Sequence, residues 1–255
     1  MAEPMSHVLL ETRQIRKRYG GIVASDGIDL DVQRGSLHAI IGPNGAGKTT
    51  LIAQLAGQLR PDSGSILFDG QPVDRLPAYQ RARAGFARSF QITNVILELT
   101  VLDNLALAVQ AREPHSFRFW TDASRDPSLR EPARHVLDTI GLSARADVPA
   151  GQLSHGEKRA LEIGIALATE PKLLLLDEPL AGTGPEEAAR VVKLLASIKG
   201  QLTILMIEHD MDAVFALADV ISVLVSGRII ASGLPAAIRA NADVRRAYLG
   251  DEGAA

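Results

Sequence analysis

The sequence predicts an α/β fold built around a parallel sheet. Short apolar runs alternate with helical patterns, and polar residues follow where each run stops. Residues 173–176, four consecutive leucines, lead directly into Asp177, and the apolar run at 202–207 leads into Glu208 and His209. Strands of a parallel sheet are buried on both faces, so they read as continuous apolar runs, and ligands bind beyond their carboxyl ends. This pattern therefore predicts a site at one edge of the sheet.

A glycine-rich loop follows a third apolar run, at residues 37–41. Residues 42–49 match the pattern G-x-x-x-x-G-K-S/T at every position, and helical spacing of apolar residues follows. Glycines let successive backbone N–H groups turn towards phosphate oxygens, while the next helix contributes its positive N-terminal end. The sequence predicts a phosphate-binding loop, in which Lys48 would neutralise the β- and γ-phosphates and Thr49 would offer its hydroxyl to Mg²⁺.

Two carboxylates at the end of the leucine run complement this loop. Mg²⁺ is a hard cation that prefers oxygen ligands and bridges the β- and γ-phosphates of a nucleotide, so Asp177 fits a metal ligand. Glu178 follows at a position where a carboxylate could polarise an attacking water. Phosphate-loop NTPases need both functions, and the order of the motifs predicts a fold of that class.

Composition and charge exclude other classes of protein. The 255 residues include 46% hydrophobic and 22% charged residues, which is ordinary for a packed globular protein. The formal net charge of -3 supplies no positive field for nucleic acid, so no nucleic-acid partner is expected. With no cysteine, disulfides and thiolate metal sites are excluded. No signal pattern and no apolar window of about 18 residues is present, which predicts a cytosolic protein.

Local patterns predict the remaining elements. We expect an edge strand at 9–15 followed by a basic turn at 16–21, a long loop at 112–132, a helix at 133–140, and a C-terminal hairpin at 221–231. Gly184 and Pro185, with acidic residues after them, predict the start of another helix. The arginines Arg81, Arg83 and Arg88 are interpreted as a solvated helix face.

These motifs together resemble the ATP-binding cassette (ABC) ATPases, and the resemblance covers nearly the whole chain. It rests on motifs in the expected order: the loop at 42–49, Gln91, Leu153-Ser154-His155-Gly156-Glu157, Asp177-Glu178 and His209. Within that superfamily the chain is similar to the ATP-binding subunits of branched-chain amino acid importers. The residues that carry this closer likeness are 90–91, 99–104, 159–163, 207–211 and 246–250.

The resemblance implies a role for each motif. ATP would be bound by Tyr19, which would stack on adenine, and by Gly42, Pro43, Asn44, Gly45, Ala46, Gly47, Lys48, Thr49 and Thr50. Thr49, Gln91 and Asp177 would coordinate Mg²⁺, directly or through water. Glu178 would be the general base, and His209 would contact the γ-phosphate. The signature residues Ser154, His155, Gly156 and Glu157 would act on the nucleotide of a second subunit, which implies a head-to-tail dimer enclosing two ATP.

The resemblance also implies an architecture and partners. One ABC ATPase domain, 1–255, would consist of a core at about 8–91 and 157–250, a mostly helical subdomain at about 92–156, and an antiparallel β edge. The chain would lie on the inner face of the cell membrane. Its partners would be two transmembrane permease subunits, a second ABC ATPase subunit of the same or a related chain, and an extracytoplasmic solute-binding protein.

Three alternatives stay open at this point. Closely similar subunits power export of lipid or polysaccharide. ABC ATPases of DNA repair or translation usually carry a long coiled-coil insertion or a second cassette, and neither is present here. A small-molecule kinase would share the phosphate loop, but that function does not explain the signature phrase at 153–157. In addition, Gly184 stands where Asp or Asn commonly contacts the partner subunit, which weakens the expectation of that contact.

Overall fold

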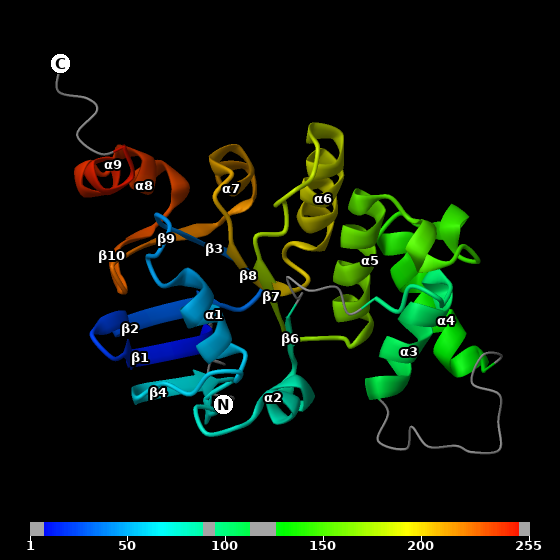
Figure 1. Ribbon diagram of the computed structural model, residues 1–255, viewed down its shortest axis with the longest axis horizontal. Helices are drawn as coiled ribbons and strands as arrows, with labels where there is room; N and C mark the ends of the chain where they lie inside the picture. Colours follow the sequence, from blue (N-terminus) through cyan, green and yellow to red (C-terminus); the bar gives the residue numbers. More distant parts are fainter. Residues whose placement is uncertain (1–7, 89–94, 113–125, 250–255) are drawn as a thin grey trace, which may run out of the picture.

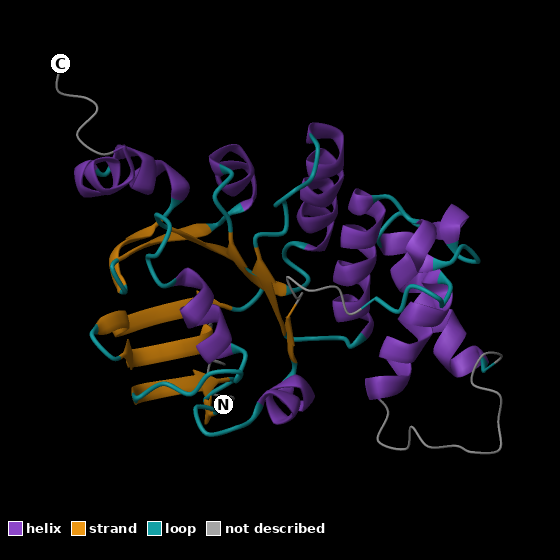
Figure 2. Ribbon diagram, viewed as in Figure 1, coloured by secondary structure: helices purple, strands orange, loops and turns teal. Residues whose placement is uncertain are grey.

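The computed structural model describes residues 8–88, 95–112 and 126–249. Two sheets and a set of helices build this part of the chain (Figures 1 and 2). The larger sheet contains, in spatial order, β10 (Arg228–Gly233), β9 (Val220–Val225), β3 (Leu37–Ile41), β8 (Thr203–Ile207), β7 (Leu173–Asp177) and β6 (Phe86–Arg88). From β9 to β6 neighbouring strands are parallel, and β10 pairs antiparallel with β9 as the predicted hairpin.

The three central strands are those expected from the apolar runs. Every residue of β3, β7 and β8 is buried, which is possible because both faces of the sheet are covered. One face packs against helices α5 (His155–Ala168), α6 (Pro185–Ile198) and α7 (Met211–Leu217). The other face packs against α1 (Lys48–Leu55) and the smaller sheet. The predicted α/β fold with an antiparallel edge is therefore present.

The smaller sheet corrects one prediction. It is antiparallel and has the order β2 (Ile22–Gln33), β1 (Val8–Tyr19), β4 (Ser63–Phe68) and β5 (Gln71–Pro72). The segment predicted as an edge strand and a basic turn is β1, which is an interior strand and continues to Tyr19. Its basic residues do not end the strand, because Arg16 pairs with Asp26 and Lys17 pairs with Asp62.

The arginine-rich segment is also different from its prediction. Arg81, on α2 (Ala78–Ala84), is only 1% exposed, and its guanidinium donates to the carbonyls of Gln54 and Leu55 at the end of α1. The last carbonyls of a helix lack N–H partners within it, so the buried cation caps α1, together with the Gly57 N–H, which donates to the Gln54 carbonyl at 3.2 Å. Arg88 lies on β6 and not on a helix. Of the three arginines, Arg83 alone belongs to an exposed helix face.

Two further helices pack against α5 on the side away from the smaller sheet (Figure 1). They are α3 (Val101–Arg112) and α4 (Pro127–Thr139). The prediction of a loop to residue 132 and a helix from 133 is wrong, since α4 begins at Pro127. The carboxylate of Asp126 accepts the Ser128 N–H at 2.9 Å and caps this helix, and proline is compatible with its first position.

The chain ends in two short helices beside β10, α8 (Pro235–Ala240) and α9 (Ala242–Leu249). Short 3-10 turns at Ser143–Arg145 and Ala150–Gln152 connect α4 with α5. Within the described ranges, none of the helices has the length and apolar character needed to cross a bilayer.

Candidate functional site

The predicted site lies at one edge of the larger sheet. In β3, β8 and β7, which are adjacent and parallel, Ile40 pairs with Ile207 and Ile207 pairs with Asp177. The strands therefore end at nearly the same level. The phosphate loop follows β3, the loop of Glu178 follows β7, and His209 follows β8, so the fold brings together three motifs that are far apart in sequence.

Two glycines of the phosphate loop are required by close backbone contacts. A Cβ at Gly42 would lie 2.1 Å from the carbonyl oxygen of Leu224, and one at Gly47 would lie 2.2 Å from that of Ala24. Gly47 also has a φ of 103°, in the region that favours glycine. The loop is thus held against β9 and β2, and its exposed residues, Asn44 and Gly45, face solvent.

Lys48 closes the loop and begins α1. Its Nζ donates to the carbonyls of Gly42 at 2.6 Å and Pro43 at 3.0 Å. Burial lowers the pKa of Lys48, while the nearby carboxylates of Glu178 and Asp177 act in the opposite direction. A cation next to backbone curved by glycines, at the start of a helix, suits a phosphate group. Thr49 is exposed in the same first turn.

Asp177 has a partner that the sequence does not predict. The Arg88 Nη2 donates to the Asp177 Oδ2 at 3.0 Å, and both side chains are largely buried. Arg88 also donates to the Gln58 side chain. A buried carboxylate needs such a partner, and within the described ranges the hydrogen bonds to the Asp177 side chain reach only Oδ2, which leaves Oδ1 for a cation. The oxygen donors of Asp177 and Thr49 thus fit the chemistry that Mg²⁺ prefers.

Glu178 stands at a bend that other groups hold in place. It has a φ of 50°, which is uncommon for a residue with a side chain and often marks a functional site. Its N–H donates to the Ile207 carbonyl at 2.9 Å. The Arg159 guanidinium donates to the carbonyls of Glu178 at 2.8 Å and Pro179 at 3.0 Å. Arg159 was not predicted as a site residue, although it lies on α5, whose first turn contains the signature residues.

His209 lies beside a buried carboxylate. Its side chain is 63% exposed, and its Nδ1 is 3.5 Å from the Glu208 Oε2. Glu208 itself has no solvent exposure and also accepts backbone N–H groups. Glu208 directly follows the apolar run at 202–207 in the sequence, but no role was predicted for it.

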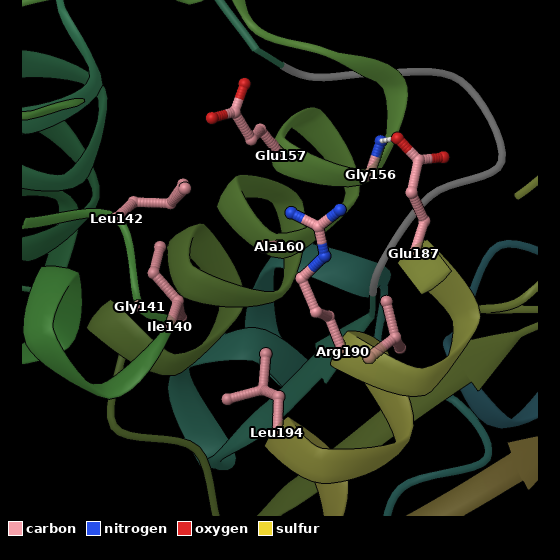
Figure 3. Close-up of a pocket in the computed structure, with 10 residues that line it drawn as sticks. Ile140, Gly141, Leu142, Gly156, Glu157, Ala160, Glu187, Arg190 and Leu194 are labelled. Atoms are coloured by element: carbon pink, nitrogen blue, oxygen red, sulfur yellow. Dashed lines mark hydrogen bonds between the residues drawn. The ribbon is translucent and has the colours of Figure 1, made fainter. Parts of the chain in front are cut away.

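The signature phrase forms the N-terminus of α5. The Ser154 Oγ accepts the Glu157 N–H at 3.2 Å, and the Glu157 carboxylate accepts the Ser154 N–H at 2.9 Å, which is a complete capping box. The Gly156 N–H donates to the Glu187 Oε1 at 3.0 Å, as Figure 3 shows. Gly156, Glu157 and Glu187, with residues 140–142 after α4 and further residues of α5 and α6, line a cavity of about 100 Å³. His155 instead lines a cavity of about 390 Å³ that it shares with Glu178 and Arg159.

The remaining predicted residues have no observed role. Tyr19 ends β1 with 49% exposure, and the Lys17 Nζ lies 5.7 Å from the centre of its ring. Gln91 lies outside the described residues. Gly184 is the N-cap of α6, where its lack of a side chain leaves the cap without a side-chain hydrogen bond.

Comparison with known families gives two matches along the chain. Residues 25–181 match the family described as ABC transporter, and residues 228–254 match the branched-chain amino acid ATP-binding cassette transporter. The first segment includes the phosphate loop, the signature phrase and both strand-end carboxylates. The second covers β10 and the C-terminal helices.

Individual relatives extend the similarity to the full length. The high-affinity branched-chain amino acid transport ATP-binding protein BraF of Pseudomonas aeruginosa is 38% identical over 97% of this chain and 100% of its own. LivG of Escherichia coli, which carries the same description, has the same identity and coverage. A solved ATP-binding cassette of an ABC transporter in its ADP conformation has 32% identity and a TM-score of 0.84, over 96% of this chain and 99% of that chain.

Proposed function

This chain belongs to the ABC transporter family and is an ATPase of that family, and on this basis we propose that it powers the uptake of branched-chain or related amino acids. The observation that carries the proposal is the extent of the similarity. It covers whole relatives named for branched-chain amino acid transport and includes the C-terminal segment at 228–254. That segment lies outside the general ABC transporter match, so it supports the narrower assignment.

The phosphate loop would hold the triphosphate of ATP. Its residues 42–50 would surround the phosphates, with the Lys48 ammonium beside the β- and γ-phosphates and Tyr19 against the adenine ring. Lys48 now donates to two carbonyls of its own loop, so this cation is already directed into the loop. Mg²⁺, when bound, would offset the charge that develops on the phosphates, and Thr49, Gln91 and Asp177 are its proposed ligands.

Hydrolysis would depend on two strand ends. The Glu178 carboxylate would take a proton from the attacking water, and His209 would hold the γ-phosphate and the water in line. The contacts of Arg159 with the carbonyls next to Glu178 support this role, because they fix the backbone that carries the base. His209 has the exposure needed to reach a nucleotide.

A second ATPase subunit would complete the site. Ser154, His155, Gly156 and Glu157 lie at a helix N-terminus, which suits an anion, and they would act on the nucleotide of the partner. ATP would close the dimer and hydrolysis would release it. Two transmembrane permease subunits and an extracytoplasmic solute-binding protein would complete the transporter, with this chain on the inner face of the membrane.

The proposed division of the chain follows from this arrangement. A core at about 8–91 and 157–250 would bind the nucleotide, and the mostly helical part at about 92–156 would transmit its closure to the permeases. The packing of α3 and α4 on α5 supports the division, since α5 connects these helices with the loop of Glu178 through Arg159.

Co-purification tests the proposal directly. The full chain, tagged and expressed in its native host, is isolated from gently solubilised membranes, and its partners are identified by mass spectrometry. We expect two multi-span membrane proteins and a cassette ATPase of the same or a related chain. The untagged strain is the control for nonspecific capture. Recovery of the chain with ribosomes or DNA, or without membrane proteins, would contradict a transport function.

Deletion of the chain separates import from export. We expect the deletion strain to grow poorly on leucine, isoleucine or valine as sole nitrogen source and normally on ammonium. Normal growth on all of these amino acids, together with a defect in the cell envelope, would instead favour an exporter.

A further inference from the structure

We propose that Glu208 is a positioning residue, whose carboxylate fixes His209 relative to the loop of Glu178. The proposal rests on the function proposed above, because that function gives His209 and Glu178 their roles. Glu208 is not among the residues that the family resemblance assigned to the site. It is placed here by its contacts alone.

The Glu208 carboxylate joins two loops, one with each oxygen. Its Oε1 accepts the N–H of Leu180 at 2.8 Å, in the loop that follows β7. Its Oε2 accepts the N–H of His209 at 2.7 Å and the N–H of Asp210 at 3.2 Å, in the loop that follows β8. The same oxygen is 3.5 Å from the His209 Nδ1. The two loops are thus tied at the edge of the sheet where the nucleotide would bind.

The burial of Glu208 indicates a role beyond filling the core. The residue has 0% exposure and directly follows five buried residues of β8. An unpaired carboxylate at such a position would be costly, and an apolar side chain would fill the space without that cost. The carboxylate instead accepts the backbone N–H groups of Leu180, His209 and Asp210, and the His209 Nδ1 lies 3.5 Å away. Its compensation therefore comes from the two catalytic loops themselves.

Glu208 would control the position of the loop after β7 relative to the loop after β8. Leu180 lies two residues after Glu178, and its N–H is held by Glu208, while Arg159 holds the carbonyl of Glu178. Both contacts hold the backbone on the C-terminal side of the base, and the Glu178 N–H, which donates to the Ile207 carbonyl at 2.9 Å, holds its N-terminal side. His209 takes its position from the other oxygen of the same carboxylate. A displacement of about 1 Å between such groups can lower a rate by about 100-fold.

Glu208→Gln tests this role with little change in shape. Both carboxylate oxygens accept N–H groups, so the amide NH₂ of glutamine would face an N–H donor in one of the loops. We expect kcat for Mg²⁺-ATP hydrolysis to fall roughly 10- to 100-fold, with nucleotide affinity by calorimetry changed by less than roughly 3-fold. Glu208→Asp keeps the charge but withdraws the oxygens by one methylene, and we expect it to lower kcat similarly.

Asp219→Asn is a matched control. The Asp219 carboxylate also accepts a backbone N–H, that of Leu37 at 2.9 Å, but at the amino end of β3, away from the nucleotide edge. The same change of carboxylate to amide should leave kcat unaltered there. Thermal melting of all variants reports folding, and Glu208→Asp serves as the second test if Glu208→Gln does not fold.

A double-mutant cycle with His209→Ala separates positioning from a structural role. If Glu208 acts through His209, Glu208→Gln should lower single-turnover phosphate release far less in the His209→Ala background than in the wild type. An undiminished effect in that background, or a normal kcat in both Glu208 variants, would overturn the proposal. Hydrolysis by the wild-type chain is measured alongside, so a failure of the proposed function would be recognised separately.

Discussion

The carboxylate of Glu187 accepts the backbone N–H of Gly156 at 3.0 Å. This contact joins the first turn of α6 to the first turn of α5, and Figure 3 shows the Glu187 side chain directed at Gly156. A helix N-terminus attracts anions, and here the chain supplies one of its own. The nucleotide of the partner subunit, proposed to bind at this turn, would meet an N–H donor that is already engaged and a negative charge beside it.

Removing this charge should favour the ATP-bound dimer. We expect Glu187→Gln to strengthen ATP-dependent dimerisation roughly 3- to 10-fold, because repulsion of the phosphate is lost. The dissociation constant is measured by sedimentation in the Glu178→Gln background, where ATP should persist. Glu186→Gln, an exposed neighbour on the same helix, is the control with the same change of charge. Weaker dimerisation in Glu187→Gln would show that Glu187 supports the signature turn instead of blocking it.

The role of Glu178 predicts a specific kinetic defect. Glu178→Gln should bind ATP with near-normal affinity but hydrolyse it roughly two to four orders of magnitude more slowly, which is the usual contribution of a general base. Nucleotide binding is measured by calorimetry and turnover by phosphate release. Turnover close to that of the wild type would remove Glu178 from this role.

We expect Lys48 to contribute to nucleotide affinity as well as to hydrolysis. Lys48→Ala removes the ammonium group directed at the Gly42 and Pro43 carbonyls, and we expect nucleotide affinity to fall roughly tenfold or more. Lys172→Ala is a suitable comparison, since the Lys172 ammonium pairs with Asp69 on the surface. Equal affinity in wild type and Lys48→Ala by calorimetry would contradict the placement of the phosphates.

The buried imidazole of His38 should make the stability of the fold depend on pH. Burial lowers the pKa of this histidine from 6.5 to about 4, and its Nε2 lies 2.8 Å from the Ser222 Oγ. The unfolded chain therefore binds the proton more readily, so the contribution to stability is fully present above pH 6.5 and is lost as pH falls towards 4. We expect a loss of about 3 kcal/mol in the free energy of unfolding across this window.

Denaturant unfolding at several pH values measures this loss. His38→Gln retains a side chain that can hydrogen bond with Ser222 but does not titrate, so its stability should decline less over the same window. Carboxylates with lowered pKa values, such as those of Asp26 and Asp62, lose their contributions at lower pH and should affect both proteins equally. Parallel curves for His38→Gln and wild type would exclude His38 as the source.

The contacts of the site were less predictable than its motifs. Arg88 and Asp177 are 89 positions apart, and Leu180 and Glu208 are 28 apart. A sequence shows which residues prefer burial, but it does not show which strand lies beside which. The interpretation of Arg88 as part of a solvated helix was wrong for that reason, because β6 places it next to the end of β7.

The sequence by itself determined the class of site. Each motif is a continuous stretch of sequence: the phosphate loop, the strand-end pair Asp177-Glu178 and the signature phrase. Each needs fixed residue types in a fixed order, because backbone geometry and charge act there at short range. Only the tertiary structure decided how these motifs are held. Glu208, Arg159 and Glu187 obtain their roles from loops and helices brought together by sheet order and helix packing, which local periodicity does not encode.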